Sequence, residues 1–175
     1  MKERKYPPRR IPKAKLDEGI ELCVDNAKRF VGSGASLAVT GDVYVAAILV
    51  SVGVEEYGKA IWLKEYHSHN EDPLVVDGAV FKDHEQKIKK AEETLPDGTL
   101  FLKSGAFDPK SFSRDSFDIG TPVDLMTRLE QLYVDWSETK RDWSRKPRVE
   151  VAKIQNCAKI VSERLAKMKE EIKRN

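Results

Sequence analysis

The most distinctive hydrophobic pattern of the chain lies at residues 42–64. Positions 43–54 form an apolar run of 12 residues that covers every side of a helix. A helix that is hydrophobic all round is normally buried in a core. Asp42 directly precedes the run and is a suitable N-cap. We therefore predict a helix over residues 42–64 and expect it to be the most buried element of the protein.

Helical periodicity continues over most of the chain, with apolar residues at three- and four-residue steps. A first helix begins near Pro12 and ends at Gly32 and Gly34, where a short turn over residues 35–41 follows. A third helix spans residues 81–95 and stops at Pro96. The stripe of the first helix consists of Leu16, Ile20, Cys23, Ala27 and Phe30; that of the third consists of Phe81, His84, Ile88, Ala91 and Leu95.

Two further helices are predicted in the second half of the chain. Thr121 and Pro122 give a strong start signal for a fourth helix. A fifth helix starts near Pro147 and carries a heptad-like apolar seam, formed by Val151, Ile154, Ala158, Val161, Leu165, Met168 and Ile172. This seam predicts a homodimer through helical surfaces, with closure of the monomer's own core as the alternative.

A long segment at residues 97–120 separates the third and fourth helices and contains four phenylalanines. Long loops without regular structure are uncommon in compact domains. We interpret this one as a flap over an apolar helix seam or as a lid over a site. No alternating pattern indicates a sheet. The predicted fold is an all-α bundle of four to five helices, with residues 1–14 as a flexible basic arm and residues 15–175 as one domain.

The amino-acid composition excludes few classes of binding partner. The 31 Lys and Arg residues nearly balance the 29 Asp and Glu residues, so net charge indicates no particular partner. Residues 1–15 hold seven basic residues and one acid, which is typical of a solvated tail or a phosphate-contacting arm. No signal-peptide pattern is present and the longest apolar run is too short to cross a bilayer. We expect a cytoplasmic protein, with Cys23 and Cys157 as reduced thiols.

The charges that follow the apolar run are the first candidate for chemistry. Glu55 and Glu56 precede Lys59 by four and three residues, the spacing at which helical side chains pair. They form either a structural ion pair or a polar site within the core. If the second and third helices form a hairpin, His84 faces these glutamates. We predict a hydrogen bond from His84 to Glu55 or Glu56, directly or through one water. A histidine held by a carboxylate is either a satisfied core residue or a general acid or base.

Other kinds of site have little support. The sequence has no Glu-x-x-His pair of the type that binds metals in helical bundles, so we expect no metal and no cofactor. Phosphate-binding glycine loops and nucleophile elbows are also absent.

The chain resembles the AbiV family of abortive-infection proteins. The resemblance is carried by residues 55–60 (EEYGKA) and residues 81–87 (FKDHEQK), and by Arg128, residues 132–135 (LYVD) and Pro147. This family is similar to the HEPN superfamily of helical proteins, which includes many ribonucleases of defence systems. The resemblance implies a phage-defence protein that arrests the growth of an infected cell by acting on RNA or on translation.

What the resemblance implies for individual residues is more specific. Catalytic roles would fall to Glu56, Lys59 and His84, and binding roles to Glu55, Lys87 and Arg128. The usual HEPN signature, arginine followed four to six residues later by histidine, is absent, so the question of an enzyme stays open. The alternative is a non-catalytic interaction module that binds a protein partner or trigger. A ribonuclease requires His84 and Lys59 to be reachable from solvent, whereas a binding module predicts that they are sealed and paired.

Overall fold

The computed structural model describes residues 6–69, 71–97, 99–100, 135–137, 142–144 and 150–174. This part of the chain is mostly helical, which confirms the predicted all-α class. Its helices are α1 (Lys13–Thr40), α2 (Val43–His67), α3 (Ala79–Lys82), α4 (His84–Glu92) and α6 (Val151–Arg174). Its strands are β1 (Arg9–Ile11), β2 (Leu74–Val76), β3 (Asp135–Ser137) and β4 (Asp142–Ser144).

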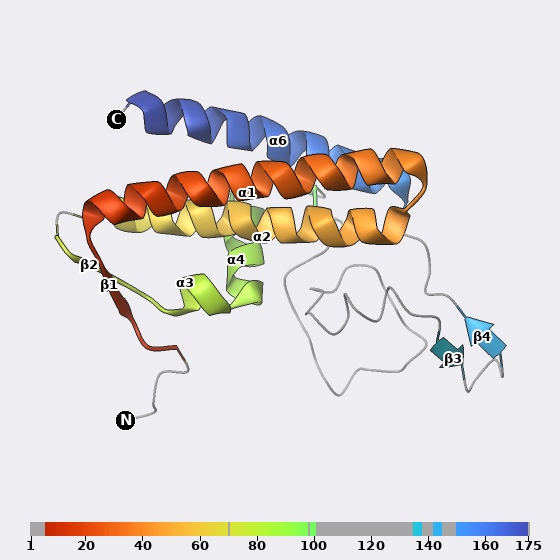
Figure 1. The fold of residues 1–175 in the computed structure, drawn as a ribbon, viewed down its shortest axis with the longest axis horizontal. Helices are drawn as coiled ribbons and strands as arrows, with labels where there is room; N and C mark the ends of the chain where they lie inside the picture. The colour runs from red at the N-terminus through yellow and green to blue at the C-terminus, as the bar shows by residue number, and fades with distance from the viewer. Residues whose placement is uncertain are drawn as a thin grey trace.

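The helices α1 and α2 form a long antiparallel hairpin (Figure 1). The helix α6 packs along this hairpin, mainly against α1, and α4 packs against α2 on the other side. The hairpin is thus the central layer of the bundle. Its second helix is covered by neighbours on several sides, as an element without a polar face requires.

Burial of α2 agrees with the sequence pattern. Ala46, Ala47, Val50 and Val54 are at most 3% exposed. The helix begins where predicted, because the Asp42 carboxylate accepts a hydrogen bond from the Val45 backbone N–H at 3.4 Å. The apolar run thus forms a helix, and that helix lies in the core, as the sequence predicted.

The predicted end of the first helix is wrong. The helix α1 passes through Gly32 and Gly34 and ends at Thr40, just before Gly41. A Cβ atom at Gly34 would lie 2.6 Å from the Val50 side chain and 2.8 Å from the Ala46 carbonyl oxygen. Gly34 therefore allows α1 and α2 to pack closely and does not terminate the helix.

The helix predicted over residues 81–95 is divided at Asp83. This residue has an extended conformation, and its carboxylate accepts a hydrogen bond from the Gln86 backbone N–H at 3.1 Å. It therefore ends α3 and caps α4. His84 becomes the first residue of α4 and is exposed, so its predicted place on a buried face is wrong. Ile88 and Ala91 are buried as predicted.

The structure also contains two short antiparallel ladders that the sequence pattern did not predict. One pairs β1 with β2 and brings Arg9 opposite Val76. The other pairs β3 with β4. Strands of three residues are too short to produce a recognisable alternation of apolar and polar positions. The first ladder fixes residues 9–11 beside the segment that joins α2 to α3.

The apolar seam of the last helix lies in the core of the chain itself. Ile154, Ala158, Val161 and Leu165 are at most 2% exposed and pack against α1 and α2. The seam therefore closes the monomer core, which was the alternative to a dimer interface. The predicted fourth helix, Arg128 and most of the segment 97–120 lie outside the described residues. Among the described helices, none is both long enough and apolar enough to cross a membrane.

Candidate functional site

The candidate site lies where α4 crosses α2. Glu55 and Lys59 are one turn apart on α2, and His84 and Lys87 are one turn apart on α4, so each pair shares a helix face. Gly58 lies at the crossing. A Cβ atom at this position would be 1.8 Å from the Lys87 carbonyl oxygen. The missing side chain therefore lets the α4 backbone rest directly on α2 and sets the distance between the two pairs.

One carboxylate oxygen links three side chains. Glu55 Oε2 lies 2.5 Å from His84 Nδ1 and 3.5 Å from Lys87 Nζ. The side chains of Glu55 and Lys87 are only 4% and 5% exposed, whereas that of His84 is 56% exposed. The predicted hydrogen bond between His84 and a glutamate is present, and the partner is Glu55. A buried ion pair therefore supports a histidine that faces solvent.

A second ion pair lies one turn further along α2. Lys59 Nζ is 3.8 Å from Glu56 Oε2, and both side chains are mostly buried but reachable from solvent. The Lys59 ammonium also lies 5.9 Å from the centre of the Phe81 ring, a cation–π distance. The Arg9 guanidinium, carried by β1, lies 4.7 Å from the centre of the same ring. Two cations thus gather around Phe81 beside the Glu55 cluster.

The thiol of Cys23 completes the buried side of the cluster. It reaches from α1 toward Glu56 and Lys59, and burial raises the pKa of this thiol to about 11. The thiol is therefore neutral near pH 7 and is a poor nucleophile. This agrees with its reading from the sequence as a reduced thiol beside the core.

The protonation state of His84 follows from its surroundings. Burial of part of the ring lowers the pKa of His84, the Lys87 ammonium lowers it further, and Asp83 opposes both effects. The ring is therefore neutral near pH 7. A neutral imidazole carries one N–H, and an ionised Glu55 carboxylate at Nδ1 accepts it. In that tautomer the other nitrogen, Nε2, keeps its lone pair.

The structure brings together five of the six residues that the sequence singled out. Glu55, Glu56, Lys59, His84 and Lys87 meet at the crossing of α2 and α4, and Arg128 lies outside the described residues. What the sequence did not predict is the burial of Lys87. The spacing of three from His84 and the adjacent Ile88 give the only signal for it. Among the described residues, no group of three or more His, Cys, Asp or Glu side chains is placed to hold a metal.

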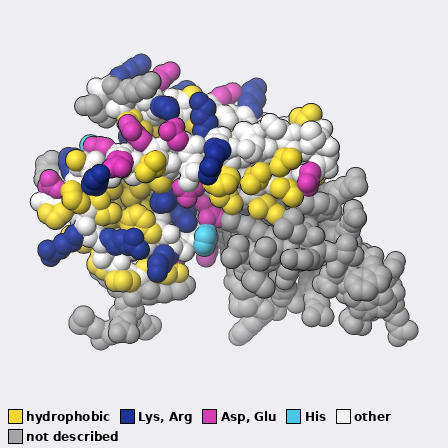
Figure 2. All heavy atoms as spheres, viewed as in Figure 1, with side chains coloured by type: hydrophobic (Ala, Val, Ile, Leu, Met, Phe, Trp, Pro, Cys, Tyr) yellow, Lys and Arg dark blue, Asp and Glu magenta, His cyan; other side chains and the backbone are white. Residues whose placement is uncertain are grey.

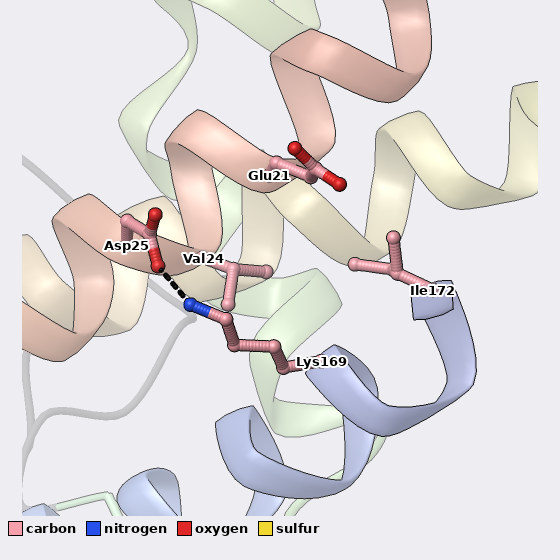
Figure 3. A pocket seen from close by; sticks show the side chains of 5 residues that line it. All are labelled: Glu21, Val24, Asp25, Lys169 and Ile172. Atoms are coloured by element: carbon pink, nitrogen blue, oxygen red, sulfur yellow. Dashed lines mark hydrogen bonds and ion pairs between the residues drawn. The ribbon is translucent and has the colours of Figure 1, made fainter. Parts of the chain in front are cut away.

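A surface hollow lies between α1 and α6, away from this cluster. It has a volume of about 240 Å³ and is lined by Glu21, Val24, Asp25, Lys169 and Ile172 (Figure 3). Lys169 Nζ and Asp25 Oδ1 are 2.8 Å apart across it, and both side chains are about half exposed. On the face in Figure 2, hydrophobic side chains of the described surface gather in groups that charged side chains border. This hollow is therefore an ordinary surface feature closed by its own ion pair.

Comparison with known proteins gives one match. The model of a family described as AbiV, within the HEPN group, matches residues 15–171 of the chain. No curated protein and no solved structure matches. The matched range includes every residue of the cluster except Arg9.

Proposed function

The chain belongs to the AbiV family of HEPN-like proteins, and from this premise we propose that it arrests growth during phage infection by cleaving RNA at the His84 site. The proposal rests on one observation. His84 is a half-exposed histidine whose Nδ1 lies 2.5 Å from a buried carboxylate oxygen. An ionised carboxylate accepts the Nδ1–H and leaves the lone pair on Nε2. That is the arrangement of a general base.

The reaction that this base supports is cleavage through the neighbouring ribose hydroxyl. His84 Nε2 takes the proton of a 2′-hydroxyl, and the 2′-oxygen bonds to the adjacent phosphorus. The bond from phosphorus to the 5′-oxygen of the next nucleotide breaks, and that oxygen takes up a proton from the imidazolium or from water. The products are a 2′,3′-cyclic phosphate and a free 5′-hydroxyl, and neither a metal nor an oxidant is needed.

The Lys59 and Arg9 cations around Phe81 would bind phosphate groups of the RNA. Lys59 is 22% exposed and its nearest carboxylate oxygen is 3.8 Å away, so its ammonium keeps hydrogen-bonding capacity. We assign it to the negative charge that develops on the phosphoryl oxygens. Glu56 then acts through Lys59 by holding its ammonium, and Arg9 lies near enough to contact a neighbouring phosphate. Arg128 keeps its expected binding role as a proposal.

The test is RNA cleavage by the purified full chain. His84→Gln removes the base and is expected to lower the cleavage rate by roughly 10²–10⁴-fold. His69→Gln is the matched control, because His69 is an exposed histidine at the end of α2 and its ring contacts only Tyr66 among the described residues. Growth arrest in cells is measured with the same variants. If His84→Gln still arrests growth fully and the wild-type chain leaves RNA intact, the chain is instead a protein-binding module.

A further inference from the structure

Residues 6–12 of the N-terminal arm lie along the segment that joins α2 to α3. Within this stretch β1 pairs with β2 in an antiparallel ladder (Figure 1). On one side of the ladder, the Lys13 backbone N–H donates to the Asp72 carboxylate at 3.1 Å. On the other side, a Cβ atom at Gly78 would lie 2.2 Å from the Pro7 carbonyl oxygen. The arm is therefore held against the fold on both sides of its strand.

The register of the ladder decides which arginine of the arm faces the site. Arg9 lies opposite Val76, which is buried, and Arg10 lies opposite Val75, which is 48% exposed. Directly opposite residues share a face of the ladder, and successive residues alternate between faces. Arg9 is therefore on the face toward the protein, and its guanidinium lies 4.7 Å from the centre of the Phe81 ring. Arg10 is on the outward face.

The charge of Arg9 is not used by the fold itself. Its side chain is exposed, and no ion pair joins it to a carboxylate of the described residues. The Lys59 ammonium lies 5.9 Å from the centre of the same Phe81 ring. Two cations from separate elements, β1 and α2, thus flank one aromatic ring. A guanidinium without a carboxylate partner is suited to bind a phosphate with two parallel hydrogen bonds.

We propose that Arg9 binds a second phosphate of the strand whose cleaved phosphate lies at Lys59, so that the docked N-terminal arm is part of the substrate site. The inference rests on the proposed function of His84 and narrows its substrate to strands with at least two successive phosphates. Phosphate contacts fix the register of a strand on a protein. The family match begins at residue 15, so Arg9 lies outside the matched range.

The first test measures binding without cleavage. The ligand is a fluorescent single strand of 2′-O-methyl RNA, whose blocked 2′-oxygen cannot attack phosphorus, and anisotropy is followed over a range of salt concentrations. Each phosphate contact with a single strand contributes about 0.7 to the slope of log affinity against log salt. Arg9→Gln is expected to reduce the slope by about this amount. Arg10→Gln removes the same charge from the outward face and is expected to leave the slope unchanged. Equal slopes for the two variants would overturn the proposal.

The second test displaces the arm and leaves Arg9 in place. Gly78 has φ −63° and ψ −20°, which alanine adopts without strain. The methyl group of Gly78→Ala therefore acts through its contact with the Pro7 backbone. This variant is expected to lower the salt slope as Arg9→Gln does, and the combined variant is expected to lower it no further. Gly32→Ala is the control, because a Cβ there meets nothing within 4 Å. A wild-type slope in Gly78→Ala would refute the role of the docked arm.

Substrate length separates this proposal from the proposed function. If the chain cleaves RNA, Arg9→Gln is expected to lower kcat/KM on a longer strand and to leave it unchanged on a dinucleoside monophosphate, which has one phosphate. A structural role of Arg9 would lower both values alike and would contradict the proposal. If the chain binds the blocked strand through Arg9 but cleaves no RNA, the cleavage function fails and the phosphate contact stands.

Discussion

Gly58→Ala is the change that tests the crossing of α2 and α4 most directly. The added Cβ would lie 1.8 Å from the Lys87 carbonyl oxygen, 2.8 Å from its carbonyl carbon and 3.1 Å from the Ala91 nitrogen. All three are backbone atoms, so no side-chain rotation can relieve the contact. The helix α4 must move away from α2, and Lys87 and His84 must move with it.

The size of the effect follows from two opposing terms. Alanine in place of glycine within a helix gains roughly 1 kcal/mol. Overpacking of a filled site costs about 1–3 kcal/mol, and a backbone contact this short belongs at or above the upper end. We expect a net loss of about 2 kcal/mol or more in the free energy of unfolding. For a domain of this size, a loss of about 2 kcal/mol corresponds to a fall in Tm of roughly 4–8 °C.

The assay is urea and thermal unfolding followed by circular dichroism. Gly32→Ala is the matched control, because Gly32 is also inside a long helix and a Cβ there meets nothing within 4 Å. The control is expected to stabilise the protein by up to about 1 kcal/mol. If Gly58→Ala were stabilised as much as Gly32→Ala, the close approach of α4 to α2 would be wrong.

Three further expectations follow from the charges and thiols. The pKa of His84 is lowered in the folded chain, so below about pH 6.5 the unfolded chain binds more protons and stability falls as the pH falls. The urea midpoint, measured between about pH 5 and 8, should therefore decline less in His84→Gln than in the wild type. Parallel curves for the two proteins would contradict the pKa shift. Burial raises the pKa of Cys23 to about 11 and that of Cys157 to about 12, so a thiol reagent near pH 8 should label both only on unfolding, and immediate labelling of folded protein would refute this. The homodimer stays a prediction, now without the α6 seam as its basis, and a light-scattering mass equal to the 19.9 kDa chain would exclude it at the concentration used.

The elements that the sequence predicted well are those whose burial is encoded locally. The apolar run of α2 and the seam of α6 each determine a buried helix without reference to other segments. Asp42 caps α2 through a hydrogen bond to the backbone of the first helical turn that follows it, so this role can be read locally. The contact between His84 and Glu55 was also predicted, because both residues were expected on buried faces, where polar groups need partners. Glu55 is buried as expected, whereas His84 is exposed.

The errors arise where a residue's role depends on a segment far away in the chain. Gly34 looks like a helix end, and only the approach of Ala46 and Val50 reveals a packing role. The break at Asp83 had a local signal, since Asp83 and Gln86 have the spacing of a capping box, but the apolar spacing through Phe81 and Ile88 suggested a continuous helix. The burial of Lys87 depends on the register of α4 against α2, and the exposed lysines beside it gave no hint of this.

The break at Asp83 also divides the site between two parts of the fold that we expect to differ in their free energy of local unfolding. Glu55 lies in the middle of α2, where backbone amides should exchange with solvent only when the whole bundle unfolds. His84 and Lys87 lie on α4, a helix of nine residues that rests mainly on α2. A short peripheral helix detaches in a sub-global opening that leaves the hairpin of α1 and α2 closed. Detachment of α4 would move His84 and Lys87 away from Glu55 in one step and expose this carboxylate to water, while the hairpin of α1 and α2 stays folded.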